Sequence, residues 1–189
     1  MKQLRSIIQT NRGITLTEVM VVVAIIGILA ALAVPSFNEQ MKQQRVEGAA
    51  EGLVAALQNA KAEAIKRNAS VRIVFTPATT NANLSTWCYG MVIIPDSTPS
   101  TTCDCTVTNS CIAGSVVQST DFTGITVNFN TSNSRVFSPL RGTATSGTIR
   151  FSAGNNKTLG VTTSSLGRIN ICKDATSTVG SYNDSGSCP

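Results

Sequence analysis

The chain has 189 residues, a net charge of +5 and no histidine, enough for one domain of ordinary size with an appendage. Without histidine it lacks the commonest general base and the commonest metal ligand. Charged residues make up only 13% of the chain, about half the usual share in soluble domains. We therefore expect no enzymatic activity, no cofactor and no bound metal.

The N-terminal residues combine a short basic leader with a long apolar segment. Residues 1–13 contain three cations and no acid, and they end in Gly13. Residues 14–34 are apolar except for two threonines and Glu18, and as a helix they are long enough to span a bilayer core. A secretory signal peptide has a shorter apolar run, and a simple anchor does not need a carboxylate at its edge. Cleavage directly after Gly13 accounts for both features.

These residues also carry a family resemblance. The sequence GITLTEV at 13–19 resembles the class III signal of type IV pilins and type II secretion pseudopilins, although Ile14 stands where phenylalanine is usual. The resemblance implies that a prepilin peptidase cuts after Gly13 and methylates Ile14. It also implies that Glu18 pairs with the amino terminus of a neighbouring subunit, since a lone carboxylate in an apolar core is unfavourable.

A second helical pattern follows the apolar segment. Pro35 lacks an amide donor, so a kink is expected there. Apolar residues then recur at spacings of three and four, which predicts one amphipathic face, and Asn68 marks the expected end of a helix running from Ile14 to Arg67. The face consists of Val46, Ala49, Ala50, Leu53, Val54, Leu57, Ala60, Ala64 and Ile65.

The remainder of the chain reads as short strands separated by Ser, Thr, Asn and Gly clusters. The expected strands are 71–75, 87–94, 115–118, 125–129, 148–152, 158–163 and 166–172. A long kinked helix packed on antiparallel strands is an α+β architecture, and the resemblance implies the type IV pilin-like fold. The expected regions are a cleaved leader (1–13), a transmembrane and assembly helix (14–35), its amphipathic continuation (36–70) and a periplasmic β-rich domain (71–189).

Six cysteines lie beyond the apolar segment, and an oxidising periplasm favours disulfides between them. Zinc is a weaker alternative because the chain has no CxxC pair and no histidine. Six cysteines allow fifteen connectivities, of which a Cys172–Cys188 bond is the simplest local one, leaving Cys88 to pair with one of the remaining three. The candidates are Cys88, Cys103, Cys105, Cys111, Cys172 and Cys188.

Two further segments narrow the resemblance. KAEAIKRNASVRIVF at 61–75 and LGRINIC at 166–172 resemble the helix-to-strand junction and closing strand of the GspH/FimT/FimU group of minor pilins and pseudopilins. The leading interpretation is a structural minor pilin that helps to prime pilus assembly at the tip. The implied partners are the prepilin peptidase, other minor pilins, the major pilin and the bacterial inner membrane, from which the subunit enters a pilus or pseudopilus.

Two alternatives remain open at this stage. One is a GspH-like minor pseudopilin of a type II secretion system. The other is a DNA-binding minor pilin, because residues 167–170 resemble the Gly-Arg-x-Arg motif of FimT-like proteins, with Asn170 at the second arginine position. Other cations would then have to supply the missing phosphate contact. The candidate DNA-binding residues are Arg168, Lys173, Arg150, Arg141 and Lys157.

Overall fold

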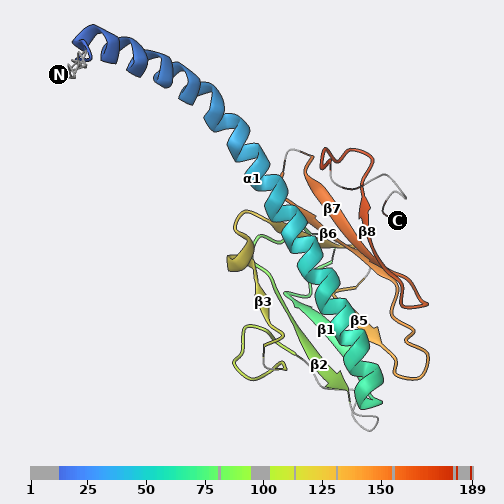
Figure 1. The fold of residues 1–189 in the computed structure, drawn as a ribbon. Coiled ribbons are helices and arrows are strands. Elements are labelled where there is room, and N and C mark those ends of the chain that lie inside the picture. The colour runs from blue at the N-terminus through green and yellow to red at the C-terminus, as the bar shows by residue number, and fades with distance from the viewer. Residues whose placement is uncertain are drawn as a thin grey trace, which may run out of the picture. The chain divides into compact units, whose positions relative to one another are not determined.

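The computed structural model describes residues 13–80, 82–94, 103–112, 114–130, 132–154, 156–180, 182 and 188, without the side chains of 32–36. Figure 1 shows one long helix followed by short strands. The chain divides into two compact units, Met1–Gln40 and Met41–Pro189. The expected leader lies outside the described residues except for Gly13.

Helix α1 spans Leu16–Arg67, close to the limits expected from the sequence. Its first turn is closed by Thr15, whose Oγ1 accepts a hydrogen bond from the Glu18 amide at 3.3 Å, as N-cap residues do. It ends where Asn68 adopts a left-handed backbone with φ of 48°, which asparagine tolerates better than most residues. The helical assignment passes through Pro35 without a break, so the kink stays a prediction.

The strands form two antiparallel four-stranded sheets. The first sheet has the order β3-β2-β1-β5, with β1 at Ser70–Thr76, β2 at Cys88–Ile94, β3 at Val117–Gln118 and β5 at Ser134–Phe137. The second has the order β4-β6-β7-β8, with β4 at Thr126–Phe129, β6 at Gly147–Ser152, β7 at Thr158–Thr163 and β8 at Ile169–Lys173. A short 3₁₀ helix, η1 at Ser119–Phe122, follows β3.

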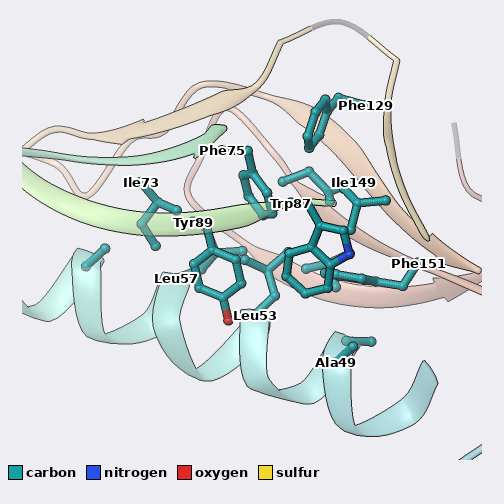
Figure 2. Close-up of a cluster of buried hydrophobic side chains, with 14 of the residues drawn as sticks. Ala49, Leu53, Leu57, Ile73, Phe75, Trp87, Tyr89, Phe129, Ile149 and Phe151 are labelled. Atoms are coloured by element: carbon teal, nitrogen blue, oxygen red, sulfur yellow. The ribbon is translucent and has the colours of Figure 1, made fainter. Parts of the chain in front are cut away.

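Both sheets and the second half of α1 contribute to one hydrophobic core in the Met41–Pro189 unit. Figure 2 shows Ala49, Leu53 and Leu57 of α1 facing aromatic side chains of the strands. Trp87 packs edge-on against Phe151, and its indole donates to the carbonyl oxygen of Ile125 at 2.9 Å. All the buried hydrophobic residues of the described chain lie between Val46 and Val179, so this unit carries its own core.

The α+β architecture is confirmed, with three differences in detail. Strand β5 was not expected, and neither was the division of the antiparallel strands into two sheets. Ile65, expected on the buried face of the helix, is 56% exposed. Among the described residues, no helix is long and apolar enough to cross a membrane.

Candidate functional site

The expected cleavage position lies at the accessible start of the described chain. Gly13, Ile14 and Thr15 precede α1 and have no regular secondary structure. Ile14 is 77% exposed. A peptidase needs backbone outside a helix, and the Gly13–Ile14 bond lies outside α1, so cleavage there stays a prediction.

Glu18 occupies the first turn of α1 and is exposed. A carboxylate there interacts favourably with the positive end of the helix dipole. Within the part of the chain that the structure describes, Glu18 has no ion-pair partner.

The apolar side chains at the start of α1 are exposed on every side of the helix. The large hydrophobic side chains from Ile14 to Leu29 are 47% to 79% exposed. A continuous exposed apolar surface of this size indicates a site that contacts protein or lipid. This segment contributes nothing to the core of the Met41–Pro189 unit.

The six cysteines form three disulfides, which are Cys88–Cys105, Cys103–Cys111 and Cys172–Cys188. The last is the local pair expected from the sequence. Within the described residues no group of three His, Cys, Asp or Glu side chains is placed to hold a metal ion.

Two of the disulfides pack directly on strand glycines. A Cβ at Gly90 of β2 would lie 2.7 Å from Cys103 Sγ and clash with Cys111. A Cβ at Gly160 of β7 would clash in the same way with the Cys172–Cys188 pair. Each sheet thus accepts a disulfide only because its strand has no side chain at that position.

The five candidate DNA-binding cations do not form one cluster. Arg168 precedes β8, at the end of the second sheet where Thr163 of β7 pairs with Ile169. Lys157 and Lys173 lie at the opposite end, where Leu159 pairs with Lys173. A six-residue strand separates these ends by about 20 Å.

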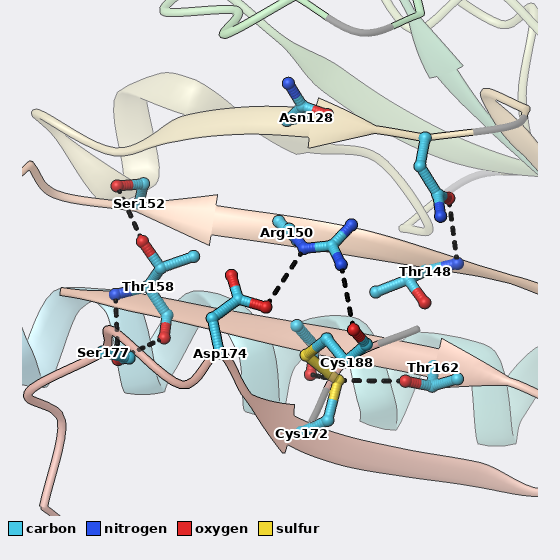
Figure 3. A network of polar contacts seen from close by, with 12 residues as sticks. Asn128, Thr148, Arg150, Ser152, Thr158, Thr162, Cys172, Asp174, Ser177 and Cys188 are labelled. Atoms are coloured by element: carbon cyan, nitrogen blue, oxygen red, sulfur yellow. Dashed lines mark hydrogen bonds and ion pairs between the residues drawn. A yellow bond between two sulfur atoms is a disulfide. The ribbon is translucent and has the colours of Figure 1, made fainter. Parts of the chain in front are cut away.

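Arg150 lies between the two ends and is already engaged. Its Nε lies 3.4 Å from Asp174 Oδ1, and its Nη2 donates to the Cys188 carbonyl at 3.3 Å. Figure 3 shows these contacts beside the Cys172–Cys188 disulfide. These contacts hold Asp174 and Cys188 against the sheet, which gives Arg150 a structural role.

Arg135 is also unavailable to a ligand. Its side chain is fully buried, and its Nη1 donates to the carbonyl oxygens of Ser132 and Ser134 at 3.1 and 2.7 Å. Burial lowers the pKa of the guanidinium to about 10. Arg135 therefore adds no positive charge to the surface of the sheet.

Arg141 and Arg168, by contrast, are brought near each other. The loop that contains Arg141 touches the loop before β8, because a Cβ on Gly167 would clash with the Gly142 carbonyl. Lys61 of α1 joins them by donating to the Gly167 carbonyl at 3.0 Å. Lys61 lies outside the apolar face that the sequence predicts for the helix, and no local pattern links it to either loop.

Family models match both parts of the chain. The prokaryotic N-terminal methylation motif matches residues 8–34, and the model of the type II transport protein GspH matches residues 49–167. The motif and the helix-plus-sheets architecture define the class, a type IV pilin or pseudopilin. Because the second match covers more than half of the sequence, the chain belongs to the GspH family.

Individual relatives match mainly at the N-terminus. The type IV major fimbrial protein FimA of Dichelobacter nodosus is 52% identical over 46 residues, 23% of this chain and 29% of its own. A fimbrial protein of Pseudomonas aeruginosa is 37% identical over 76 residues, 40% of this chain and 49% of its own. The match thus spans less than a third of the FimA relatives.

Two crystal structures of the type IV minor pilin FimU of Pseudomonas aeruginosa resemble the chain at 19% identity. One has a TM-score of 0.49 and covers 71% of this chain and 91% of FimU. The other has a TM-score of 0.45 and covers 66% and 90%.

Proposed function

We propose that this chain is a minor pilin, a non-enzymatic structural subunit that helps to prime assembly at the tip of a type IV pilus. The observation that carries the proposal is the exposed apolar segment at the start of α1. The Gly13–Ile14 bond lies directly before this segment, and the segment contains one carboxylate, Glu18. A prepilin peptidase would remove the leader and methylate Ile14. Other minor pilins and the major pilin are the proposed partners.

The segment has a role both before and after assembly in this proposal. Before assembly its exposed apolar side chains are held in the inner membrane, with the Met41–Pro189 unit in the periplasm. After assembly the same side chains pack against those of neighbouring subunits. Glu18 then pairs with the amino terminus of a neighbour, which offsets the desolvation of both charges and sets the register.

The test is a Glu18→Ala substitution in cells that make the pilus. The variant should remain in the membrane fraction at the wild-type level but disappear from sheared filaments. Thr17→Ala, one residue away, is the matched control and should assemble normally. Normal incorporation of Glu18→Ala, or a chain recovered from membranes that still begins at Met1 while the peptidase is active, would contradict the proposal.

A pseudopilus of a type II secretion system is the second candidate, and the family model that covers residues 49–167 favours it. Both functions use the same processing and the same apolar segment. Deleting the chain separates them. Loss of piliation with normal secretion supports the pilus, and loss of secretion with normal piliation supports the pseudopilus.

DNA binding is a third candidate, favoured by the approach of the loops that carry Arg141 and Arg168. If DNA binds there, Arg141→Gln with Arg168→Gln should weaken a gel shift strongly and reduce its salt dependence. Lys157→Gln with Lys173→Gln, about 20 Å away, should have a smaller effect. Equal losses in both double variants would argue for a diffuse attraction without a defined site.

A further inference from the structure

Two loops meet Lys61 of α1 at one end of the folded unit, and the surface around this junction is here called the loop-tip surface. It consists of residues 138–144, residues 164–168, and Lys61 and Ile65. The loops are joined by the Gly142–Gly167 contact, by the hydrogen bond from Lys61 Nζ to the Gly167 carbonyl, and by a hydrogen bond of 3.1 Å from the Ala144 amide to the Ser165 carbonyl.

The backbone of both loops depends on glycine. Gly142 and Gly167 have φ values of 60° and 71°, in the left-handed region that glycine adopts without strain. Gly167 additionally has no room for a Cβ against the carbonyl of Gly142. The two loop tips are therefore held in a defined arrangement, and the side chains beside these glycines are displayed on a constrained backbone.

This surface displays large apolar side chains to solvent. Leu140 is 86% exposed and Leu166 is 77% exposed, more than any other large hydrophobic residue described in the Met41–Pro189 unit. Ile65, one turn beyond Lys61 on the same side of α1, adds a third at 56%. A single exposed leucine is ordinary, but three apolar side chains on joined elements indicate a contact surface.

The same surface is basic. Arg141 follows Leu140 directly, Arg168 lies two residues after Leu166, and Lys61 stands between the loops. Residues 138–144 and 164–168 contain no acid. Neither arginine side chain has a hydrogen-bond or ion-pair partner within the described chain. Two cations without a partner in the described chain, Arg141 and Arg168, thus lie on the same joined loops as two highly exposed leucines, with the half-buried Lys61 between them.

A partner for this surface must offer negative charge and, directly beneath it, apolar volume. Nucleic acid meets the first condition, but single strands are bound by stacking on aromatic rings, which leucine and isoleucine cannot provide. An anionic bilayer meets both, because phosphates attract Lys and Arg while leucines enter the boundary between headgroups and acyl chains. We propose that the loop-tip surface binds anionic phospholipid bilayers.

The bilayer contact is separate from the apolar segment at 14–31. It is carried by the folded unit and does not depend on cleavage, on assembly or on the kind of filament. A chain held in one bilayer by its N-terminal segment would be able to dock a second bilayer through this surface.

The test is vesicle docking by the full chain. The protein is reconstituted into phosphatidylcholine vesicles, and a second population is added that contains either phosphatidylcholine alone or equal parts of phosphatidylcholine and phosphatidylglycerol. Docking is measured by light scattering per vesicle-bound chain. If the protein or a variant does not insert into the neutral vesicles, its binding to the anionic vesicles is measured directly by co-flotation.

The wild-type chain should dock anionic but not neutral vesicles. Arg141→Gln with Arg168→Gln should weaken docking by about thirty-fold, since each cation near the surface contributes about fivefold. Leu140→Ser with Leu166→Ser should weaken it by about tenfold or more. The matched controls, Arg45→Gln with Lys66→Gln for charge and Val107→Ser for an exposed apolar residue, should dock as the wild type does.

Three results would overturn the proposal. One is equal docking to neutral and anionic vesicles. Another is docking that the four loop-tip substitutions leave unchanged. The third is docking that is lost with the arginines, untouched by the leucine changes and abolished by competing duplex DNA, which would identify a nucleic-acid surface. Near-ultraviolet circular dichroism of each variant confirms that the fold is kept.

Discussion

The two halves of α1 are built from similar apolar residues and use them in opposite ways. Val21, Ile25 and Leu29 in the first half are 51% to 61% exposed, whereas Leu53 and Leu57 in the second half are fully buried. The second half therefore stabilises the unit it belongs to, and the first half leaves its apolar surface for other molecules. Stability and assembly should be separable by substitutions within one helix.

The largest expected difference comes from shortening one leucine in each half. Leu53→Ala removes core packing and should lower the free energy of unfolding by about 2–5 kcal/mol. Leu29→Ala removes a side chain that is 61% exposed and should change it by less than about 0.5 kcal/mol. Denaturant unfolding of both variants measures the difference. Similar losses in the two would mean that the first half also stabilises the fold.

The comparison extends to the C-terminal disulfide, which belongs entirely to the folded unit. Replacing Cys172 and Cys188 with serine opens a loop with a sequence separation of 16 and should cost about 3 kcal/mol. Gly160→Ala alone should cost about 1–3 kcal/mol, because its Cβ would meet the disulfide sulfurs. Filament incorporation should persist wherever the unit still folds.

A double-mutant cycle sharpens that result. When Gly160→Ala is added to the chain without the disulfide, its cost should fall to well under half of its value in the parent, because the obstructing sulfur atoms are gone. The coupling between positions in contact is then visible as non-additivity. Strict additivity would mean that Gly160 is required for a reason other than the disulfide.

The smallest expected effect concerns Tyr182, whose hydroxyl donates to Glu51 Oε1 of α1 at 2.6 Å. Tyr182→Phe should lower the free energy of unfolding by about 1 kcal/mol at neutral pH. Burial and the bond to Glu51 raise the pKa of Tyr182 to about 12. A raised pKa stabilises the fold fully below the ordinary pKa near 10, and this contribution disappears as pH rises through 12.

The pH dependence provides its own control. The stability difference between wild type and Tyr182→Phe should be constant from neutral pH to pH 10 and should shrink between pH 10 and about 12. Unfolding curves measured in parallel across this range test the sign. A difference that grows with pH would mean that the Tyr182–Glu51 contact does not stabilise the folded unit.

Much of the architecture is predictable from local pattern. The helix end at Arg67 follows from Asn68 and the loss of apolar periodicity, and β1 and β7 coincide with alternating β-branched runs. Strand β5 cannot be predicted from local pattern because Ser134–Phe137 is short and contains an arginine. Its alternation of buried and half-buried residues becomes visible only when it pairs with β1. The division into two sheets likewise depends on pairings between distant segments.

The candidate site shows the same limit. Gly13, Ile14 and Glu18 are recognisable because their spacing is local. The joining of Lys61, Arg141 and Arg168 is not, because it depends on a contact between two loops and a helix that are far apart in the chain. Mid-strand Gly90 and Gly160 carry a usable signal, since glycine weakens a strand unless something packs close to its backbone.

Helix α1 continues without a break from Leu16 to Arg67, and this continuity has a mechanical consequence. A tensile force applied to the first half of the helix enters the folded unit through the buried face from Val46 to Ala64, which packs on strands of both sheets. The same hydrophobic core that stabilises the folded unit would therefore also resist a pulling force on the helix.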